Sequence, residues 1–385
     1  MLKKVVRRCI VTDMPVTFSF PTTVLFGPGT VKELPHRLTS MGATKPLIVT
    51  DKGLIGTPAF RAIEALSGGK WPVFSGVTPN PVEDDVERGA EAYRKGGCDS
   101  VVAVGGGSAL DVGKVIRIRV AWPDVPLRGF NPPAKAARVP LAPCVTIPTT
   151  AGTGSEIGRS SVIVFDGKKA VVFHPSLLAK LAILDPELTV GLPPKLTAAT
   201  GADALTHCIE SYTSPEFHPM CDGIALEGVR LIADALPRAV RDGGDVDARG
   251  KMQVAAMMGG VAFQKDLGAA HSLSHPLSSI CGLHHGTANA LTLPVVMRFN
   301  AERKPGLYAR VGAAMGISDA TDRAAIDAVS GLLRDVGLPE GLRAHGVKES
   351  QFDALAEQAF ADPCHRTNPV PVTRDDLRRL YQQAM

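Results

Sequence analysis

Half of the ten histidines in this chain fall in three short patches of its second half. TGADALTHCIE places Asp203 four residues before His207, and GAAHSLSHPL places His271 four residues before His275. Residues four apart on a helix project from the same face. HHGTANA adds two more imidazoles, those of His284 and His285. A carboxylate with several imidazoles suits a divalent metal such as Fe²⁺ or Zn²⁺. Any one histidine could be a core or capping residue, but together they predict a metal site.

A glycine run in the first half has the composition of a phosphate-binding turn. In VVAVGGGSALDVGKV, an apolar strand leads into Gly105, Gly106 and Gly107, and Ser108 is placed to cap a helix beginning near Ala109. Glycines let the backbone approach a pyrophosphate, and a helix N-terminus supplies free N–H groups. The run differs from the common dinucleotide fingerprint G-x-G-x-x-G. A tight turn without a ligand therefore stays open as the alternative.

Two other strand ends carry polar residues. Asp51 directly follows the apolar run Leu47–Thr50, where a carboxylate can bind both ribose hydroxyls of adenosine and would repel a 2′-phosphate, favouring NAD over NADP. A surface turn aspartate is the alternative interpretation. IPTTAGTGSE, residues 147–156, is a loop rich in threonine and glycine after another strand. Ligands bind at this carboxyl edge in open α/β folds, although a plain surface loop has the same composition.

The elements that must position these residues differ between the two halves. Short apolar runs at 47–50, 101–104 and 144–147 predict buried parallel strands. Val86, Ala90 and Tyr93 mark an amphipathic helix that ends at Gly96-Gly97. Asp166-Gly167 predicts a hairpin over Ser161–Phe173. Helix-period segments follow Pro193-Pro194. We therefore predict a dinucleotide-binding α/β domain over 1–193 and an all-helical domain over 194–385.

Composition excludes several classes of protein. The 385 residues carry 42 basic and 38 acidic side chains, and aromatic residues make up 5%. Neither a basic block nor a stacking platform for nucleic acid is present. No apolar run reaches the roughly 18 residues of a membrane span, and the basic N-terminus lacks the apolar core of a signal peptide. The seven cysteines, Cys9 among them, form no CxxC pair, so a reduced cytoplasmic protein is expected.

The order and spacing of the motifs resemble the iron-containing, or group III, alcohol dehydrogenases. The resemblance runs from Phe26-Gly27-Pro28-Gly29 to Asn368-Pro369, which is most of the chain. The matching pieces are TPNP, GGGSALD, PTTAGTGSE, DPELT, ATGADALTHCIE, HSLSHP and HHGTANA. The resemblance implies an N-terminal dinucleotide-binding α/β domain, an all-helical C-terminal domain and an active site in the cleft between them.

The resemblance also implies a role for individual residues. Carried over position by position, the metal ligands are Asp203, His207, His271 and His285. His284 is then a neighbour, because the family's ligand directly precedes a glycine. His275 matches a histidine near the substrate that is assigned to proton relay or substrate contact. The expected metal is one divalent ion, with Fe²⁺ favoured and Zn²⁺ as the alternative.

The cofactor implied by the family is NAD. Its pyrophosphate turn matches Gly105, Gly106, Gly107 and Ser108, and Asp51 matches the position that prefers NAD. Cofactor contacts near the nicotinamide side match Thr149 and Thr150, and a lysine that reaches the ribose matches Lys169.

We therefore expect an NAD-dependent dehydrogenase that acts on a primary or secondary alcohol, or on its aldehyde or ketone. The family commonly forms dimers or rings of dimers, so a homodimer or larger homo-oligomer is expected. A hydroxy-acid dehydrogenase or hydroxyacid–oxoacid transhydrogenase on the same fold is the alternative, with Arg366 or Lys265 as the cation for a carboxylate. The segment FQKDLGAAH before His271 is one residue shorter than in better-known members, which leaves the substrate open. A non-catalytic metal- or nucleotide-sensing module is the rival from another class.

Overall fold

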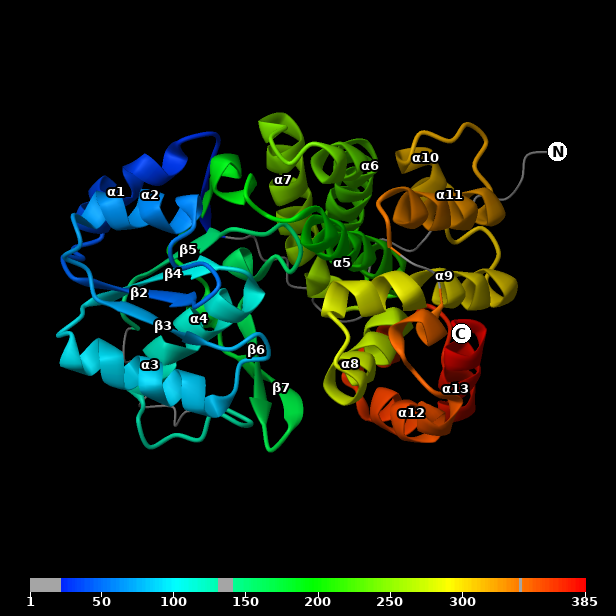
Figure 1. Cartoon of the computed structure of the whole chain (residues 1–385). Helices are drawn as coiled ribbons and strands as arrows, with labels where there is room; N and C mark the ends of the chain where they lie inside the picture. Colours follow the sequence, from blue (N-terminus) through cyan, green and yellow to red (C-terminus); the bar gives the residue numbers. More distant parts are fainter. Residues whose placement is uncertain (1–21, 131–140, 339–340) are drawn as a thin grey trace.

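A computed structural model describes residues 22–130, 141–338 and 341–385 of the chain. The sheet with its helices occupies one side of the molecule in Figure 1, and helices α5 to α13 occupy the other. Cys9 and the basic N-terminal segment lie outside the described residues. Within those residues, no helix combines the length and the apolar character needed to cross a membrane.

Six parallel strands form the sheet, in the order β1-β8-β5-β4-β2-β3. They are β1 (Thr23–Phe26), β2 (Pro46–Asp51), β3 (Val73–Val77), β4 (Ser100–Gly105), β5 (Cys144–Pro148) and β8 (Leu181–Leu184). The predicted strands at 47–50, 101–104 and 144–147 are therefore confirmed as β2, β4 and β5. These three strands are neighbours in the sheet, so their carboxyl ends lie side by side.

Alternate residues of each strand enter separate cores on the two faces of the sheet. Ile48 packs with α1 (Leu34–Ser40) and α2 (Pro58–Ser67), which cover one face. Leu47 and Val49 pack with α3 (Glu83–Lys95) and α4 (Gly107–Ala121) on the other. Both faces are buried, which explains why these strands read as continuous apolar runs.

The predicted helix and hairpin of this half are also present. Val86, Ala90 and Tyr93 are buried on α3, and Gly96 caps its C-terminus. β6 (Ser160–Phe165) and β7 (Lys168–Phe173) form an antiparallel pair. Asp166 and Gly167 connect them with φ values of 48° and 73°, as a primed turn requires.

The remainder of the described chain is helical. Its helices are α5 (Pro194–Thr213), α6 (Pro219–Arg241), α7 (Val246–Ala262), α8 (Ala269–Cys281), α9 (His285–Arg303), α10 (Ala309–Ala314), α11 (Asp322–Asp335), α12 (Phe352–Ala361) and α13 (Arg374–Gln383). The described residues after β8 contain no strand. The domain boundary at 193/194 stays a prediction, although α5 begins at Pro194.

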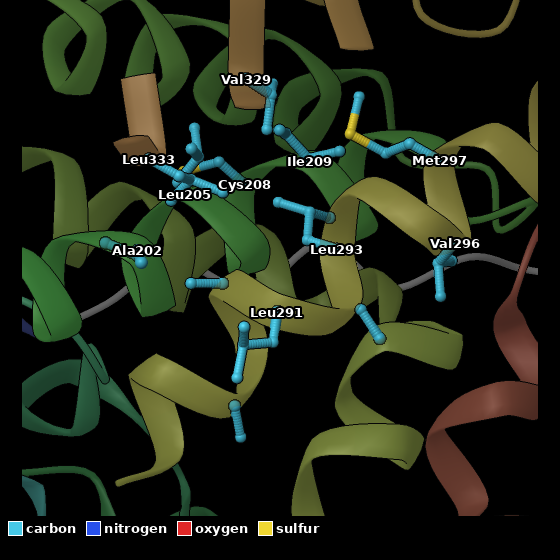
Figure 2. Packing of buried hydrophobic residues seen from close by; sticks show 14 of the residues in the cluster. Ala202, Leu205, Cys208, Ile209, Leu291, Leu293, Val296, Met297, Val329 and Leu333 are labelled. Atoms are coloured by element: carbon cyan, nitrogen blue, oxygen red, sulfur yellow. The ribbon is translucent and has the colours of Figure 1, made fainter. Parts of the chain in front are cut away.

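Helix α5 has two kinds of buried face. Ala202, Leu205 and Ile209 point into an apolar cluster with residues of α9 and α11, among them Leu293 and Val329 (Figure 2). Figure 1 shows α5 in the middle of the molecule, with the sheet domain on one side and the helices α8 to α13 on the other. The packing of its apolar residues therefore fixes the position of the polar residues that lie between them on the same helix.

Candidate metal centre and cofactor edge

The cofactor residues predicted in the first half lie together at the carboxyl edge of the sheet. Asp51 ends β2, Gly105 ends β4, and Thr149 follows β5. The backbone N–H of Thr149 donates to the carbonyl of Gly105 over 3.0 Å. A Cβ added at Gly105 would lie 3.5 Å from Asp51 Oδ2, and one added at Gly106 would lie 3.6 Å from Thr150 Cγ2. These strand ends thus form one continuous polar edge.

The glycine turn is made by backbone conformation. Gly105 has a φ of 141°, which side-chain-bearing residues rarely adopt, and a Cβ there would lie 2.9 Å from Ala109 Cβ. Helix α4 begins at Gly107 with Gly106 as its N-cap, so the prediction that Ser108 caps a helix near Ala109 is wrong. The Ser108 hydroxyl instead donates to the carbonyl of Pro79 over 2.8 Å. The backbone N–H of Ala109 donates to the carbonyl of Gly106 over 3.1 Å, which leaves the N–H groups of Gly107 and Ser108 without intrahelical acceptors.

Lys169 connects this edge with the helical domain. It lies on β7, and the carboxylates of Asp203 and Asp111 are close enough to interact with its charge. Burial outweighs both carboxylates and lowers the pKa of Lys169. The lysine predicted to reach the cofactor ribose is therefore close to Asp203 of α5 and to Asp111 of α4.

Three helices bring the predicted metal ligands together. Asp203 and His207 lie on α5, His271 on α8, and His285 is the first residue of α9. Asp203 Oδ1 lies 3.5 Å from His285 Nε2 and 3.7 Å from His271 Nε2. It lies 3.9 Å from His207 Nδ1, a buried nitrogen that has no hydrogen-bond partner among the described residues. One carboxylate facing three imidazoles fits a divalent metal of borderline softness, such as Fe²⁺ or Zn²⁺.

A glycine permits this convergence. A Cβ on Gly286 would lie 1.9 Å from the carbonyl oxygen of Ala199, which belongs to α5. Only a residue without a side chain allows the start of α9 to lie so close to the α5 backbone. His285 precedes Gly286 directly, so this close approach carries its imidazole to Asp203.

The charges of the site favour a cation. Burial alone would raise the pKa of Asp203, but the nearby imidazoles of His207, His285 and His271 hold it well below its usual range. Burial lowers the pKa of His207 and, more strongly, that of His285. Burial disfavours charged His271 as well, yet the carboxylates of Asp203 and Glu210 outweigh it and raise its pKa to about 9. The site thus combines an ionised carboxylate with imidazoles, two of which favour the neutral, metal-binding form.

Sequence reasoning missed three polar residues of this centre. Glu210 Oε2 lies 2.6 Å from His271 Nδ1. Asn289 Nδ2 donates to Asp203 Oδ1 over 2.8 Å and lies 3.3 Å from the Nε2 atoms of His271 and His285. Spacing could have identified both, because Glu210 follows His207 by three residues and Asn289 follows His285 by four. The third, Asp362, gives no such signal.

His275 is on α8, as predicted, but its contacts differ from those of His271. Its Nδ1 lies 2.7 Å from Asp362 Oδ2, which belongs to the segment before η9 (Pro363–Thr367). The His275 side chain is 27% exposed, whereas that of His271 is 1% exposed. His285 is 26% exposed, so the centre is open to solvent on the side of these two imidazoles.

The two candidate cations for a substrate carboxylate have different surroundings. Lys265 is completely buried, and its ammonium group binds the carboxylate of Asp222 and the carbonyl of Tyr212. Its charge is already compensated within the protein. Arg366 is exposed, two residues after Cys364, and within the described chain it has no hydrogen bond or ion pair. Cys364, Asp362 and His275 form one cluster of possible ligand atoms.

Known proteins match the chain over nearly its whole length. The family model described as iron-containing alcohol dehydrogenase matches residues 21–186, and the C-terminal model of the Fe-containing alcohol dehydrogenase family matches residues 197–385. The 4-hydroxybutyrate dehydrogenase of Cupriavidus necator is 44% identical, covering 93% of this chain and 96% of the relative.

Solved structures agree with these matches. A 1,3-propanediol oxidoreductase superimposes with a TM-score of 0.89 at 35% identity, covering 96% of this chain and all of the other. The sulfoacetaldehyde reductase of Bifidobacterium kashiwanohense, solved in complex with NAD⁺, gives a TM-score of 0.87 at 34% identity over 96% of this chain and 99% of the other.

Proposed function

Because this chain belongs to the iron-containing alcohol dehydrogenase family, we propose that it oxidises an alcohol, or reduces the matching carbonyl, at Asp203 and the imidazoles around it. The protein is an NAD-dependent oxidoreductase that uses a divalent metal. The observation that carries the assignment of the site is the position of Asp203 Oδ1, which faces nitrogen atoms of His207, His271 and His285 at 3.5 to 3.9 Å.

We propose that Asp203, His207, His271 and His285 hold one metal ion, with Fe²⁺ favoured and Zn²⁺ as the alternative. When bound, such a metal acts as a Lewis acid that lowers the pKa of an alcohol and polarises a carbonyl. Asn289 supports the donor set by binding Asp203 Oδ1. The burial of the ligands excludes water from all but the side of His275 and His285, where a substrate can enter.

The cofactor edge is proposed to bind NAD(H). Gly105, Gly106 and Gly107 allow the backbone to approach the pyrophosphate, and the first turn of α4, including the backbone of Ser108, offers it N–H groups. Asp51 would accept from the adenosine ribose hydroxyls. Thr149, Thr150 and Lys169 would orient the nicotinamide end toward Asp203, near which Lys169 lies.

The proposed proton acceptor is His275. When its Nδ1–H donates to Asp362, its Nε2 carries the lone pair and can take the proton released by the alcohol hydroxyl. In the reverse direction the same nitrogen returns the proton. A ring that is partly exposed can exchange this proton with solvent.

The test is elemental analysis of anaerobically purified protein together with NAD-linked rates over a panel of plain alcohols and hydroxy acids. We expect one metal per chain and turnover of at least one alcohol with NAD. Active protein that contains no metal would contradict the site. Metal-loaded protein without turnover on the panel would contradict the activity.

A second candidate substrate class is the ω-hydroxy acids, because one relative is a 4-hydroxybutyrate dehydrogenase and Arg366 is exposed two residues after Cys364, a member of the cluster with His275. If Arg366 binds a carboxylate, Arg366→Gln should raise KM for 4-hydroxybutyrate about tenfold and leave KM for 1-butanol unchanged. Arg323→Gln, at an exposed position of α11, is the matched control. Equal changes for both substrates would exclude this role.

A homodimer or larger homo-oligomer is proposed from the family, and light scattering of the purified protein measures it. The cytoplasm is the proposed location. The free state of the six cysteines in the described residues is compatible with a reducing compartment.

A further inference from the structure

Two histidines of α8, one helical turn apart, each bind a different carboxylate through the same ring nitrogen. His271 Nδ1 lies 2.6 Å from Glu210 Oε2, and His275 Nδ1 lies 2.7 Å from Asp362 Oδ2. The two rings have centroids 5.9 Å apart. Glu210 comes from α5 and Asp362 from the segment between α12 and η9. Two neighbouring imidazoles of one helix are thus held by two distant parts of the chain.

Glu210 is fixed rigidly at the start of α8. Its second oxygen, Oε1, accepts from the backbone N–H of Ala270 over 2.6 Å. A Cβ on Gly268 would lie 2.7 Å from the same oxygen, so glycine leaves room for the carboxylate. Glu210 is 4% exposed. With Nδ1 of His271 engaged, the nitrogen left for another partner is Nε2, which faces Asp203.

Two donors besides His275 hold Asp362 in place, and the paired His275 is thereby kept away from Asp203. Asp362 Oδ1 accepts from the hydroxyl of Ser272 and from the backbone N–H of Cys364, each over 2.9 Å. The Ser272 hydroxyl in turn accepts from the backbone N–H of His365 over 2.8 Å. Within the described chain, the imidazoles that lie within 4.0 Å of the Asp203 carboxylate are those of His207, His271 and His285, and not that of His275.

We propose that Glu210 and Asp362 are positioning residues that assign these two histidines to different tasks. Glu210 presents Nε2 of His271 to the metal, and Asp362 holds His275 outside the ligand set with its Nε2 free for the substrate. A neutral imidazole has one N–H, so a carboxylate on Nδ1 decides which nitrogen carries the lone pair. The assignment of Asp362 rests on the proposed function, whereas that of Glu210 rests on metal binding alone.

The experiment compares Glu210→Gln and Asp362→Asn in metal affinity and in kinetics. Metal-free protein is titrated with Co²⁺, and the dissociation constant and the visible absorption spectrum of the bound ion are recorded. We expect Glu210→Gln to weaken Co²⁺ binding 10- to 100-fold, as loss of an outer partner of a ligand does. Asp362→Asn should keep the affinity within about twofold and keep the spectrum, while kcat with NAD falls about 10- to 100-fold and KM for the alcohol changes little.

Asp376→Asn is the matched control. Asp376 is another hydrogen-bonded carboxylate of the C-terminal segment. It accepts from the hydroxyl and the backbone N–H of Thr373, and it pairs with Arg379. Its loss should change neither metal affinity nor kcat. Circular dichroism checks the fold of each variant. If Asp362→Asn does not fold, Ser272→Ala, which removes one donor to Asp362, should lower kcat without weakening Co²⁺ binding.

Several results would overturn the inference. Wild-type affinity in Glu210→Gln contradicts the role of Glu210, and weakened Co²⁺ binding in Asp362→Asn makes His275 a ligand. Uptake of a second Co²⁺ that Cys364→Ser abolishes would make His275, Asp362 and Cys364 a metal site of their own. Wild-type protein that binds Co²⁺ without NAD-linked turnover contradicts the proposed function. The titration of Glu210→Gln with Co²⁺ still tests the role of Glu210 in metal binding.

Discussion

The cofactor edge and the metal centre are built from different parts of the polypeptide. Backbone makes most of the first: the glycine turn after β4, the first-turn N–H groups of α4 and the strand end at Thr149. Side chains make the second, and α5, α8 and α9 supply them. A backbone site tolerates side-chain changes around it, whereas a side-chain site depends on each donor and on the packing that brings the helices together. Variants of the metal centre should therefore lose metal binding, whereas variants of the cofactor edge should change the use of the cofactor and keep the metal.

The largest effect is expected at the metal centre. His271→Ala removes one donor and leaves Glu210 buried without its imidazole. Metal content should fall toward zero, and NAD-linked turnover should fall about a thousandfold, because Lewis-acid stabilisation contributes several kcal/mol. Elemental analysis and steady-state kinetics measure both. His36→Ala, at an exposed position of α1, is the control. Full activity in His271→Ala would remove the metal centre from the mechanism.

The next effect tests whether packing alone holds the donors together. Gly286→Ala adds a Cβ 1.9 Å from the Ala199 carbonyl oxygen, so α9 must move away from α5 and carry His285 with it. We expect metal binding to weaken about 10- to 100-fold, although every ligand is retained. Gly331→Ala on α11, where an added Cβ meets nothing within 4 Å, is the control. Unchanged affinity in a titration with Co²⁺ would show that the helices need not approach so closely.

A smaller effect is expected at the cofactor edge. Asp51→Gly removes the carboxylate beside the glycine turn, so the preference of kcat/KM for NAD over NADP should narrow about tenfold. Metal content should stay at the wild-type value, because Asp51 and the ligand set lie on different elements. Wild-type protein that already uses NADPH better than NADH would contradict this role of Asp51.

The smallest effect on activity is expected for the buried carboxyl of Glu156, which lies in η3 (Ser155–Ile157). Burial raises the pKa of Glu156 to about 7 from an ordinary value of 4.5. The folded state then binds the proton more tightly, so the free energy of unfolding falls as pH rises through this interval. The Glu156→Gln variant has no ionisable group at this position. The unfolding temperature of the variant minus that of the wild type should therefore be a few degrees larger at pH 8 than at pH 4.5.

Thermal unfolding at the two pH values measures this difference, and Glu64→Gln at an exposed position of α2 is the control. Turnover at saturating substrate should not change. Parallel pH profiles for the wild type and Glu156→Gln would show that Glu156 is ionised at little cost in the folded protein.

Patterns of neighbouring residues were sufficient to predict much of the secondary structure of this molecule. The period of apolar residues predicted β2, β4, β5 and α3, and the Asp-Gly turn predicted the β6–β7 hairpin. Spacing of four residues predicted the shared helix of Asp203 and His207, and that of His271 and His275. Strand propensity, primed turns and helical periodicity depend on a few consecutive residues, which the sequence lists directly.

Tertiary structure decided which groups meet. Sequence placed Ser108 as a helix cap, but Gly106 is the N-cap of α4 and the hydroxyl of Ser108 donates to the carbonyl of Pro79. The pairing of His275 with Asp362 joins residues 87 positions apart, and that of Lys265 with Asp222 compensates a charge that sequence had left free for a substrate. A buried charge or imidazole takes the partner that packing brings within hydrogen-bond distance, and this choice depends on the whole fold rather than on neighbouring residues.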